Sequence, residues 1–148
     1  MLVRGFLLAK FKVVGYKIYL VPNSLPLLRC FLENGEEFNM SSIPVDAAIA
    51  IERLANGEDL TTDPRLNLPL MLAEIPGVEK SIRDSISEVF IDDFIQSDAG
   101  YVYVATVVLN LNGRSVKKLM VPSNAIILAL LSDADVYVDN KFLSETSA

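Results

Sequence analysis

Apolar and β-branched residues gather in short stretches along the chain, and the spacing of these stretches predicts β-strands. A strand is expected over residues 10–21, where aromatic and β-branched residues are interrupted by lysines. Residues 27–32 and 37–43 predict a hairpin, because Asn34-Gly35 between them is a favoured two-residue turn. Further strands are expected at residues 86–95, 101–111, 114–121 and 135–138.

Two stretches carry the start and stop signals of helices. Residues 44–57 begin with Pro, contain good helix formers and end with Asn-Gly, which is the expected asymmetry of a helix. Residues 122–131 also begin with Pro but are apolar on every side, so this helix must be buried in the core or in a subunit interface. Shorter helices are expected at residues 68–75 and 78–83.

This order of strands and helices predicts an α+β fold with a curved, mainly antiparallel sheet and two principal helices. A length of 148 residues fits a single domain, with residues 144–148 as a disordered tail. A hairpin followed by a helix that begins at Pro occurs twice. Either an internal repeat or shared helix-start chemistry explains this echo.

The composition is 51% hydrophobic, which is enough apolar surface to offset the entropy of ordering the chain. The net charge of −6 repels polyanions and excludes a broad phosphate-tracking surface. The basic residues are nevertheless segregated, because the first acidic residue is Glu33 and five basic residues precede it. A local basic face is therefore compatible with an acidic protein.

The N-terminal apolar stretch is too short for a signal peptide, because Lys10, Lys12 and Lys17 interrupt it. No uncharged stretch reaches the roughly 20 apolar residues that cross a bilayer, so no membrane segment is expected. Cys30 is the single cysteine, which excludes an internal disulfide and fits a cytoplasmic protein with this residue as a small buried hydrophobe.

Several blocks of sequence follow one another between these elements in a distinctive order. They are Leu60-Thr61-Thr62-Asp63, Ile91-Asp92-Asp93-Phe94 followed by Asp98, Gly100 and Tyr103, Pro122-Ser123-Asn124-Ala125-Ile126-Ile127-Leu128-Ala129, and Asp135-Val136-Tyr137-Val138. Their order and spacing resemble the bifunctional nuclease family, small α+β domains assigned DNase and RNase activity. The resemblance covers residues 13–143 and implies a hydrolase that cleaves DNA or RNA.

The chain departs from this family at four polar positions. The family usually has Glu at the position of Asp46, His at Thr62, Arg at Val121 and Asp at Asn124. Each change removes or shortens a polar group but leaves the helix starts intact. Two functions follow: a nuclease, or a catalytically degenerate member that persists as a homo-oligomeric binding or regulatory module, with a dimer as the expected oligomer.

The chain contains no His, which excludes Ser-His-Asp and Cys-His nucleophiles and zinc sites of the His or multi-Cys type. The resemblance implies that catalysis rests on Asp46, Asp63, Asp93 and Asn124, with Asp46 and Asp93 as ligands of Mg²⁺ or Mn²⁺ and no organic cofactor. The alternative is structural: Asp46 and Asn124 cap helices, Asp63 precedes Pro in a turn and Asp93 ends a strand in solvent.

Lysines on two predicted strands are candidates for contact with a nucleic acid. Lys10 and Lys12 lie on one face of the first strand, since side chains repeat every two residues. Lys117 and Lys118 lie on a later strand, and nearby tyrosines offer stacking surfaces. The alternative is an ordinary solvated sheet face, where Lys also prevents edge-to-edge pairing.

Overall fold

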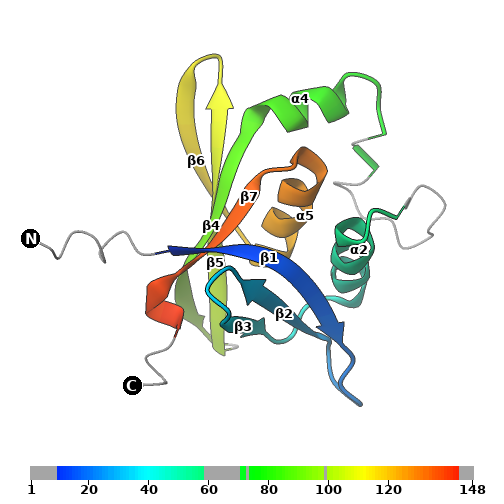
Figure 1. Ribbon diagram of the computed structural model, residues 1–148, viewed down its shortest axis with the longest axis vertical. Coiled ribbons are helices and arrows are strands. Elements are labelled where there is room, and N and C mark those ends of the chain that lie inside the picture. The colour runs from blue at the N-terminus through cyan, green and yellow to red at the C-terminus, as the bar shows by residue number, and fades with distance from the viewer. Residues whose placement is uncertain (1–9, 59–70, 73, 99, 144–148) are drawn as a thin grey trace, which may run out of the picture.

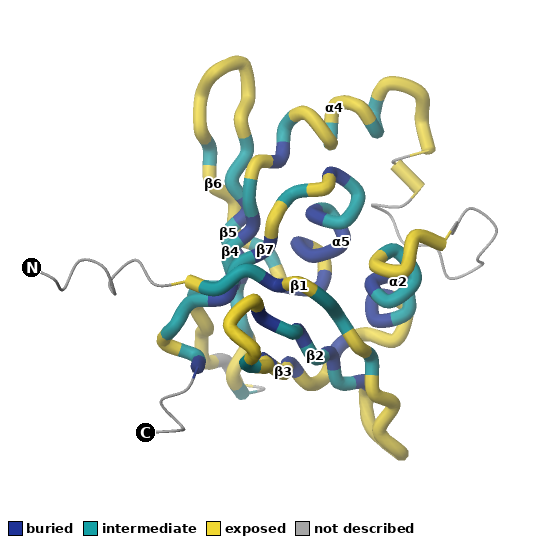
Figure 2. Tube along the Cα trace, in the orientation of Figure 1, coloured by how far each residue is buried: buried dark blue, intermediate teal, exposed yellow. Residues whose placement is uncertain are grey.

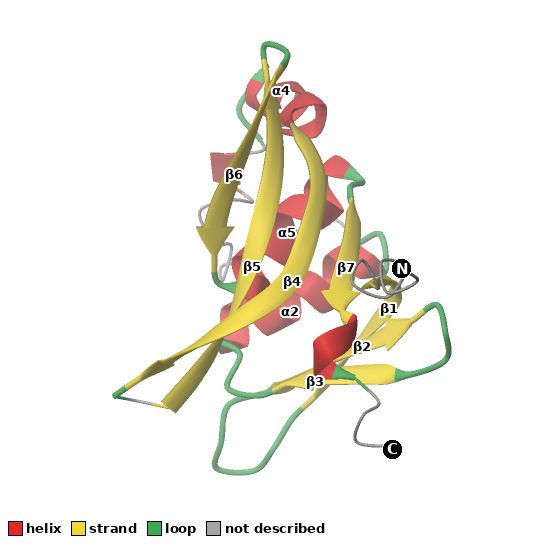
Figure 3. Cartoon of the chain, turned by 90° about the vertical axis from the view of Figure 1, so that its left-hand side faces the viewer, coloured by secondary structure: helices red, strands yellow, loops and turns green. Residues whose placement is uncertain are grey.

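The computed structural model describes residues 10–58, 71–72, 74–98 and 100–143. The seven strands within these ranges form one open sheet in the order β3-β2-β1-β7-β4-β5-β6 (Figure 1). Helices cover one face of this sheet (Figure 3). The predicted α+β fold with a mainly antiparallel sheet and two principal helices is confirmed.

One antiparallel group contains β1 (Lys10–Tyr19), β2 (Leu27–Leu32) and β3 (Glu37–Met40). The turn between β2 and β3 is at Asn34-Gly35, as predicted, and Gly35 adopts a φ of 91° that favours glycine. β3 is shorter than predicted, because Ser42 adopts a φ of 61° and breaks the extended conformation.

A second antiparallel group contains β4 (Ile86–Ser97), β5 (Gly100–Leu111) and β6 (Arg114–Met120). The turn that joins β5 and β6 is Asn112-Gly113, with φ values of 54° and 85°. Two successive positive φ angles define the type I′ turn, whose twist matches that of the flanking strands. This turn joins the two strands predicted at residues 101–111 and 114–121.

β7 (Asp135–Asp139) joins the two groups at the centre of the sheet. It pairs with β4 in parallel and with β1 in the antiparallel sense. Its pairing with β1 covers only Lys10–Lys12, after which the two strands diverge. The sequence predicted β7 as a strand but gave no sign of its neighbours.

The principal helices are α2 (Val45–Ala55) and α5 (Pro122–Ser132), and they pack against each other behind the sheet (Figures 1 and 3). The shorter α4 (Val78–Ser85) leads into β4, and a 3-10 turn at Asn140–Phe142 follows β7. α5 contacts β4, β5 and β7, and Ile126 and Ile127 are fully buried. The prediction that this apolar helix is buried is therefore confirmed.

The main core lies between the sheet and the two principal helices (Figure 2). Val89, Ile91, Ala105 and Val107 face the helices from β4 and β5 and are fully buried. Cys30 is also fully buried, as predicted from the sequence. Within the described ranges, no helix has the length and apolar character needed to cross a membrane.

Candidate functional site

Asp46 and Asn124 lie at equivalent places, in the first turns of α2 and α5. Both are exposed, and the Asp46 carboxylate accepts a hydrogen bond of 2.9 Å from the Ala47 amide. The residues at the N-cap positions are Pro44 and Val121, and neither helix has a side-chain cap. Asp46 and Asn124 are therefore not the N-cap residues, although the Asp46 carboxylate does accept one first-turn amide hydrogen.

Asp93 lies on β4, at a bulge where the pairing with β5 shifts by one residue. Its carboxylate accepts the amide hydrogen of Phe94 at 2.8 Å, and the neighbouring Asp92 accepts the Thr106 hydroxyl at 3.1 Å. A bulge turns adjacent side chains toward the same face, and both aspartates line one groove there. The bulge therefore creates a pair of adjacent carboxylates.

The predicted catalytic residues that the structure describes come from different layers of the fold. Asp93 pairs with Val104 on the face of the sheet away from the helices, whereas Asp46 belongs to a helix on the other side (Figure 3). Asp63 lies outside the described residues. No cluster of three or more His, Cys, Asp or Glu residues suited to a metal ion occurs among the residues described.

The four predicted substrate-binding lysines lie on two strands that are far apart in the sheet. Three strands separate β1 from β6, a distance of about 19 Å at the usual strand spacing. Lys10 lies over the rings of Phe90 and Tyr137, with its ammonium 4.5 and 4.3 Å from their centroids. Lys12 forms an ion pair of 3.3 Å with Asp135.

Lys117 and Lys118 are neighbours on β6, so their side chains point to opposite faces of the sheet. Lys117 pairs with Val108, on the face away from the helices. Lys118 pairs with Val107, on the helix side. The two residues therefore do not contribute to a common surface.

The face of the sheet away from the helices, here called the outer face, was not singled out from the sequence. β4, β5 and β6 form two cross-strand rows on it. The members of these rows are Glu88, Val108 and Lys117 in one, and Phe90, Thr106 and Leu119 in the other. Ile95, Val102, Leu119 and Val121 are 36–72% exposed, so the outer face carries an open apolar surface.

A groove of about 400 Å³ runs along the outer face, lined by Asp92, Asp93, Val102, Leu119 and Val121 among others. We call it the outer groove. It combines two carboxylates with apolar walls. The sequence contains a sign of these apolar walls in the period-two alternation of β5 and β6, because Val102, Val104 and Leu119 fall on one face of their strands.

A second pocket, of about 320 Å³, lies where the two principal helices begin. We call it the helix-start pocket. Its lining residues are Met40, Ser41, Ser42, Ile43, Pro44, Tyr101, Val102, Tyr103, Val121, Pro122 and Ser123. It brings together three segments that are distant in the sequence, and it adjoins the outer groove at Val102, Tyr103 and Val121.

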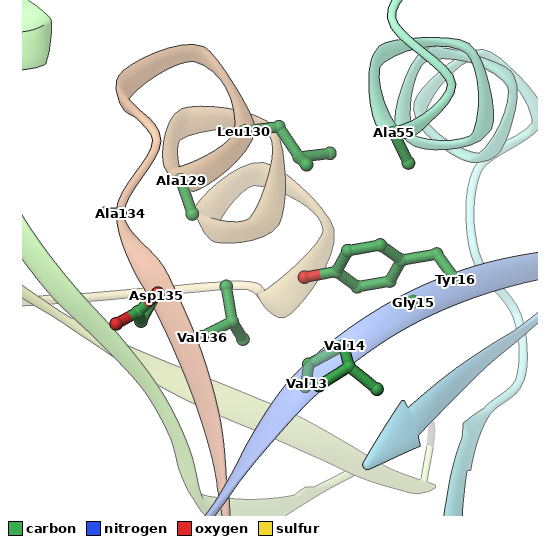
Figure 4. Close-up of a pocket in the computed structure, with 10 residues that line it drawn as sticks. All are labelled: Val13, Val14, Gly15, Tyr16, Ala55, Ala129, Leu130, Ala134, Asp135 and Val136. Atoms are coloured by element: carbon green, nitrogen blue, oxygen red, sulfur yellow. The ribbon is translucent and has the colours of Figure 1, made fainter. Parts of the chain in front are cut away.

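A third pocket, of about 210 Å³, opens where β1 and β7 diverge (Figure 4). The phenol of Tyr16 points into it from β1, toward Ala129 and Leu130 of α5 (Figure 4). Burial raises the pKa of Tyr16 well above its ordinary value, so the phenol stays protonated. Burial also raises the pKa of the Cys30 thiol to about 12, which removes it as a nucleophile.

In comparisons with known proteins, no family model and no curated protein matches this chain. The resemblance to the bifunctional nuclease family consequently stays a prediction.

Proposed function

We propose that this chain works as a homodimeric binding or regulatory module, in which two copies meet through the outer faces of β4, β5 and β6. The observation that carries the proposal is the make-up of the two cross-strand rows. In one row the β4 end is acidic and the β6 end is basic, and in the other both ends are apolar. Each row is therefore complementary to its own reversed copy.

The symmetry of the dimer follows from these rows. Most dimers have a two-fold axis, which makes the same patch face itself. Suppose that the axis runs parallel to β5 and lies between two sheets packed about 10 Å apart. Each row then lies over the same row of the partner, and its β4 end lies over the partner's β6 end. Lys117 then faces the partner's Glu88, and Leu119 faces the partner's Phe90. The proposed contact buries the most exposed apolar side chain of the rows, since Leu119 is 72% exposed.

Charge selects this axis over the alternative. An axis perpendicular to the strands places β4 of one copy over β4 of the other. Glu88, Asp92 and Asp93 then face an equally acidic strand, and like charges held opposite each other are unfavourable. The parallel axis instead places each β4 opposite the basic end of the partner's row.

A charge-swap experiment tests the dimer. Sedimentation equilibrium of the wild type is expected to give a dimer, and Lys117→Glu should weaken it by about tenfold, because two ion pairs become two repulsions. Combining Lys117→Glu with Glu88→Lys should restore the wild-type affinity. Lys118→Glu is the matched control, because this residue has the same charge and strand but lies on the other face.

A second candidate function is that of a nuclease on DNA or RNA, which requires Mg²⁺ or Mn²⁺. Besides the resemblance, the adjacent carboxylates of Asp92 and Asp93 in the outer groove favour it, because paired oxygen ligands suit these ions. Single-turnover cleavage of labelled DNA and RNA, with and without each metal, compares the wild type with an Asp46→Ala, Asp93→Ala double variant.

The two assays separate the two functions. Cleavage by the wild type that the folded double variant loses establishes a carboxylate-based nuclease. Equal cleavage in both preparations, or none in either, removes the nuclease. A wild type that stays monomeric at every concentration, or that Lys118→Glu weakens as much as Lys117→Glu does, contradicts the dimer.

A further inference from the structure

We infer that the helix-start pocket is a binding site for a small oxyanion, the phosphate or carboxylate group of a low-molecular-weight ligand. Two helices of 11 residues, α2 and α5, begin at the wall of this one pocket. The N-terminus of a helix carries a partial positive charge and unpaired amide hydrogens, so it favours an anion. Two such ends at one pocket add their effects.

The first turns of both helices keep free amide hydrogens. The first hydrogen bond within α2 runs from Ala48 to Pro44, and the first within α5 runs from Ala125 to Val121. Among the described residues, the amides of Val45, Asp46, Ser123 and Asn124 have no hydrogen-bond acceptor. α5 also has no acidic residue in its first turn, so nothing in that turn neutralises its positive end.

Ser123 gives an independent sign of a ligand. The residue is only 5% exposed, and its hydroxyl has no hydrogen-bond partner in the described part of the chain. Every fully buried polar side-chain atom among the described residues does have a partner. The Ser123 hydroxyl must therefore reach open space, and the space that Ser123 lines is the helix-start pocket. A nearly buried serine with an unused hydroxyl there is suited to bind a ligand oxygen.

The rest of the lining determines the class of ligand. Ser41, Ser42, Tyr101 and Tyr103, which carry hydroxyl groups, also line the pocket, and among the described residues no Lys or Arg lines it. Hydroxyls and helix ends without a formal cation bind a compact oxyanion through hydrogen bonds and do not track a polymeric backbone. A volume of about 320 Å³ is at the lower end of the range for ligand pockets, which fits a small molecule.

Asp46 opposes the anion, because its carboxylate already occupies the first turn of α2. It is exposed and binds the Ala47 amide, so the amides of Val45 and Asp46 stay available. Removing this charge should strengthen the binding of an anion. Asp46→Asn is accordingly a gain-of-affinity variant.

Nuclear magnetic resonance of ¹⁵N-labelled protein, titrated with inorganic phosphate and separately with acetate, tests the inference. The amide signals of Val45, Asp46, Ser123 and Asn124 should shift together and saturate with one dissociation constant. Potassium chloride at matched ionic strength should not shift them. The comparison of phosphate with acetate distinguishes a phosphorylated ligand from a carboxylate ligand.

Variants then locate the site. Ser123→Asp places a carboxylate in the pocket and should weaken phosphate binding by about tenfold or more. Ser123→Ala removes only the hydroxyl and should weaken binding severalfold, which keeps the test available if Ser123→Asp does not fold. Ser132→Ala is the control, because this buried serine donates to the Leu128 carbonyl at the other end of α5.

Signals that never saturate, or that saturate equally in Ser123→Asp and in the wild type, overturn the inference. Binding that is stronger in Asp46→Asn and weaker in both Ser123 variants supports it. The inference does not rest on the dimer, because the oligomeric state of each variant is measured separately by sedimentation. Loss of the dimer and loss of anion binding are therefore distinguishable.

Discussion

Cys30 and Tyr16 face each other across β1 and β2, where their pairing brings two ionisable groups into the core. Burial raises the pKa of Cys30 from its ordinary value of 9.0 to about 12, and raises that of Tyr16 in the same direction. Each group is neutral when protonated, so folding favours the protonated form. Because the unfolded chain loses these protons at lower pH, alkali shifts the equilibrium toward unfolding.

We expect the free energy of unfolding to be unaffected by Cys30 below pH 9.0 and to fall between pH 9.0 and about 12. The loss is about 1.4 kcal/mol per pH unit for one proton released on unfolding. Urea unfolding at a series of pH values measures this slope. Cys30→Ala should be less stable overall but should show a shallower slope, and equal slopes in the two proteins would contradict the assignment.

The residue scale is also where sequence and structure agree least. The family resemblance predicts Asp46 and Asp93 as catalytic residues. A resemblance between sequences gives the order of these residues along the chain but not the side of the sheet on which each one lies. Lys117 and Lys118 show the same limit, because adjacent strand residues point to opposite faces. The unused hydroxyl of Ser123 becomes informative only once its burial is known.

At the scale of elements, a side chain of α2 forms a hydrogen bond with the free edge of β1. The Glu52 carboxylate accepts the Ile18 amide hydrogen at 3.4 Å, in a partly buried place beyond the point where β1 and β7 diverge. Glu52→Ala leaves this amide without its acceptor and should lower the free energy of unfolding by about 1 kcal/mol.

Glu52→Gln is the matched control for this contact, because its amide oxygen still accepts the hydrogen bond from Ile18. Its free energy of unfolding should stay within about 0.5 kcal/mol of the wild type. Urea denaturation followed by circular dichroism measures both variants. A loss in Glu52→Gln as large as that in Glu52→Ala would show that the charge matters and not the acceptor.

α5 is the central element of the core, and its stability comes from packing. Ile126 is fully buried, so Ile126→Ala leaves a cavity and should cost about 2–5 kcal/mol in the free energy of unfolding. Val45→Ala, at a side chain that is 46% exposed on α2, should change stability by no more than about 0.5 kcal/mol. Similar losses in the two variants, measured by urea denaturation, would contradict the central place of α5.

Most elements were predictable because their signals are local. The Asn-Gly pairs define both hairpin turns, and Pro marks the first residue of α5 and the residue before α2. The position of β7 was not predictable, because its five residues indicate a strand without indicating a neighbour. Its insertion between β1 and β4 depends on which strand edges stay free after the two antiparallel groups have formed, which is a tertiary property.

At the scale of the whole molecule, the same limit applies to the candidate sites. The helix-start pocket gathers residues from the ends of β3, β5 and β6, and each segment alone reads as an ordinary loop or helix start. The outer face is an alternating strand pattern that leaves open whether water or a protein covers it. The register of strand pairing determines which residues of different strands form one surface. It brings Glu88, Val108 and Lys117 into one row.

Net charge opposes the proposed dimer while the rows favour it, and salt separates the two effects. Each copy carries a charge of −6. With centres about 30 Å apart, roughly twice the expected radius of gyration, the unscreened repulsion in water is about 5 kcal/mol. Salt at about 0.01 M leaves roughly a third of this energy, and at about 0.15 M only a few per cent.

Raising the salt between these concentrations should therefore relieve about 2 kcal/mol of repulsion. The same salt weakens the two symmetric Lys117–Glu88 pairs by less than this, since exposed ion pairs typically contribute a few tenths of a kcal/mol each to binding. We expect sedimentation equilibrium to show a dimer that tightens on the order of tenfold with salt. Lys117→Glu makes each copy more negative by two charges, so the affinity of its dimer should rise more steeply with salt. A wild-type dimer that weakens with salt would mean that local ion pairs outweigh the net charge.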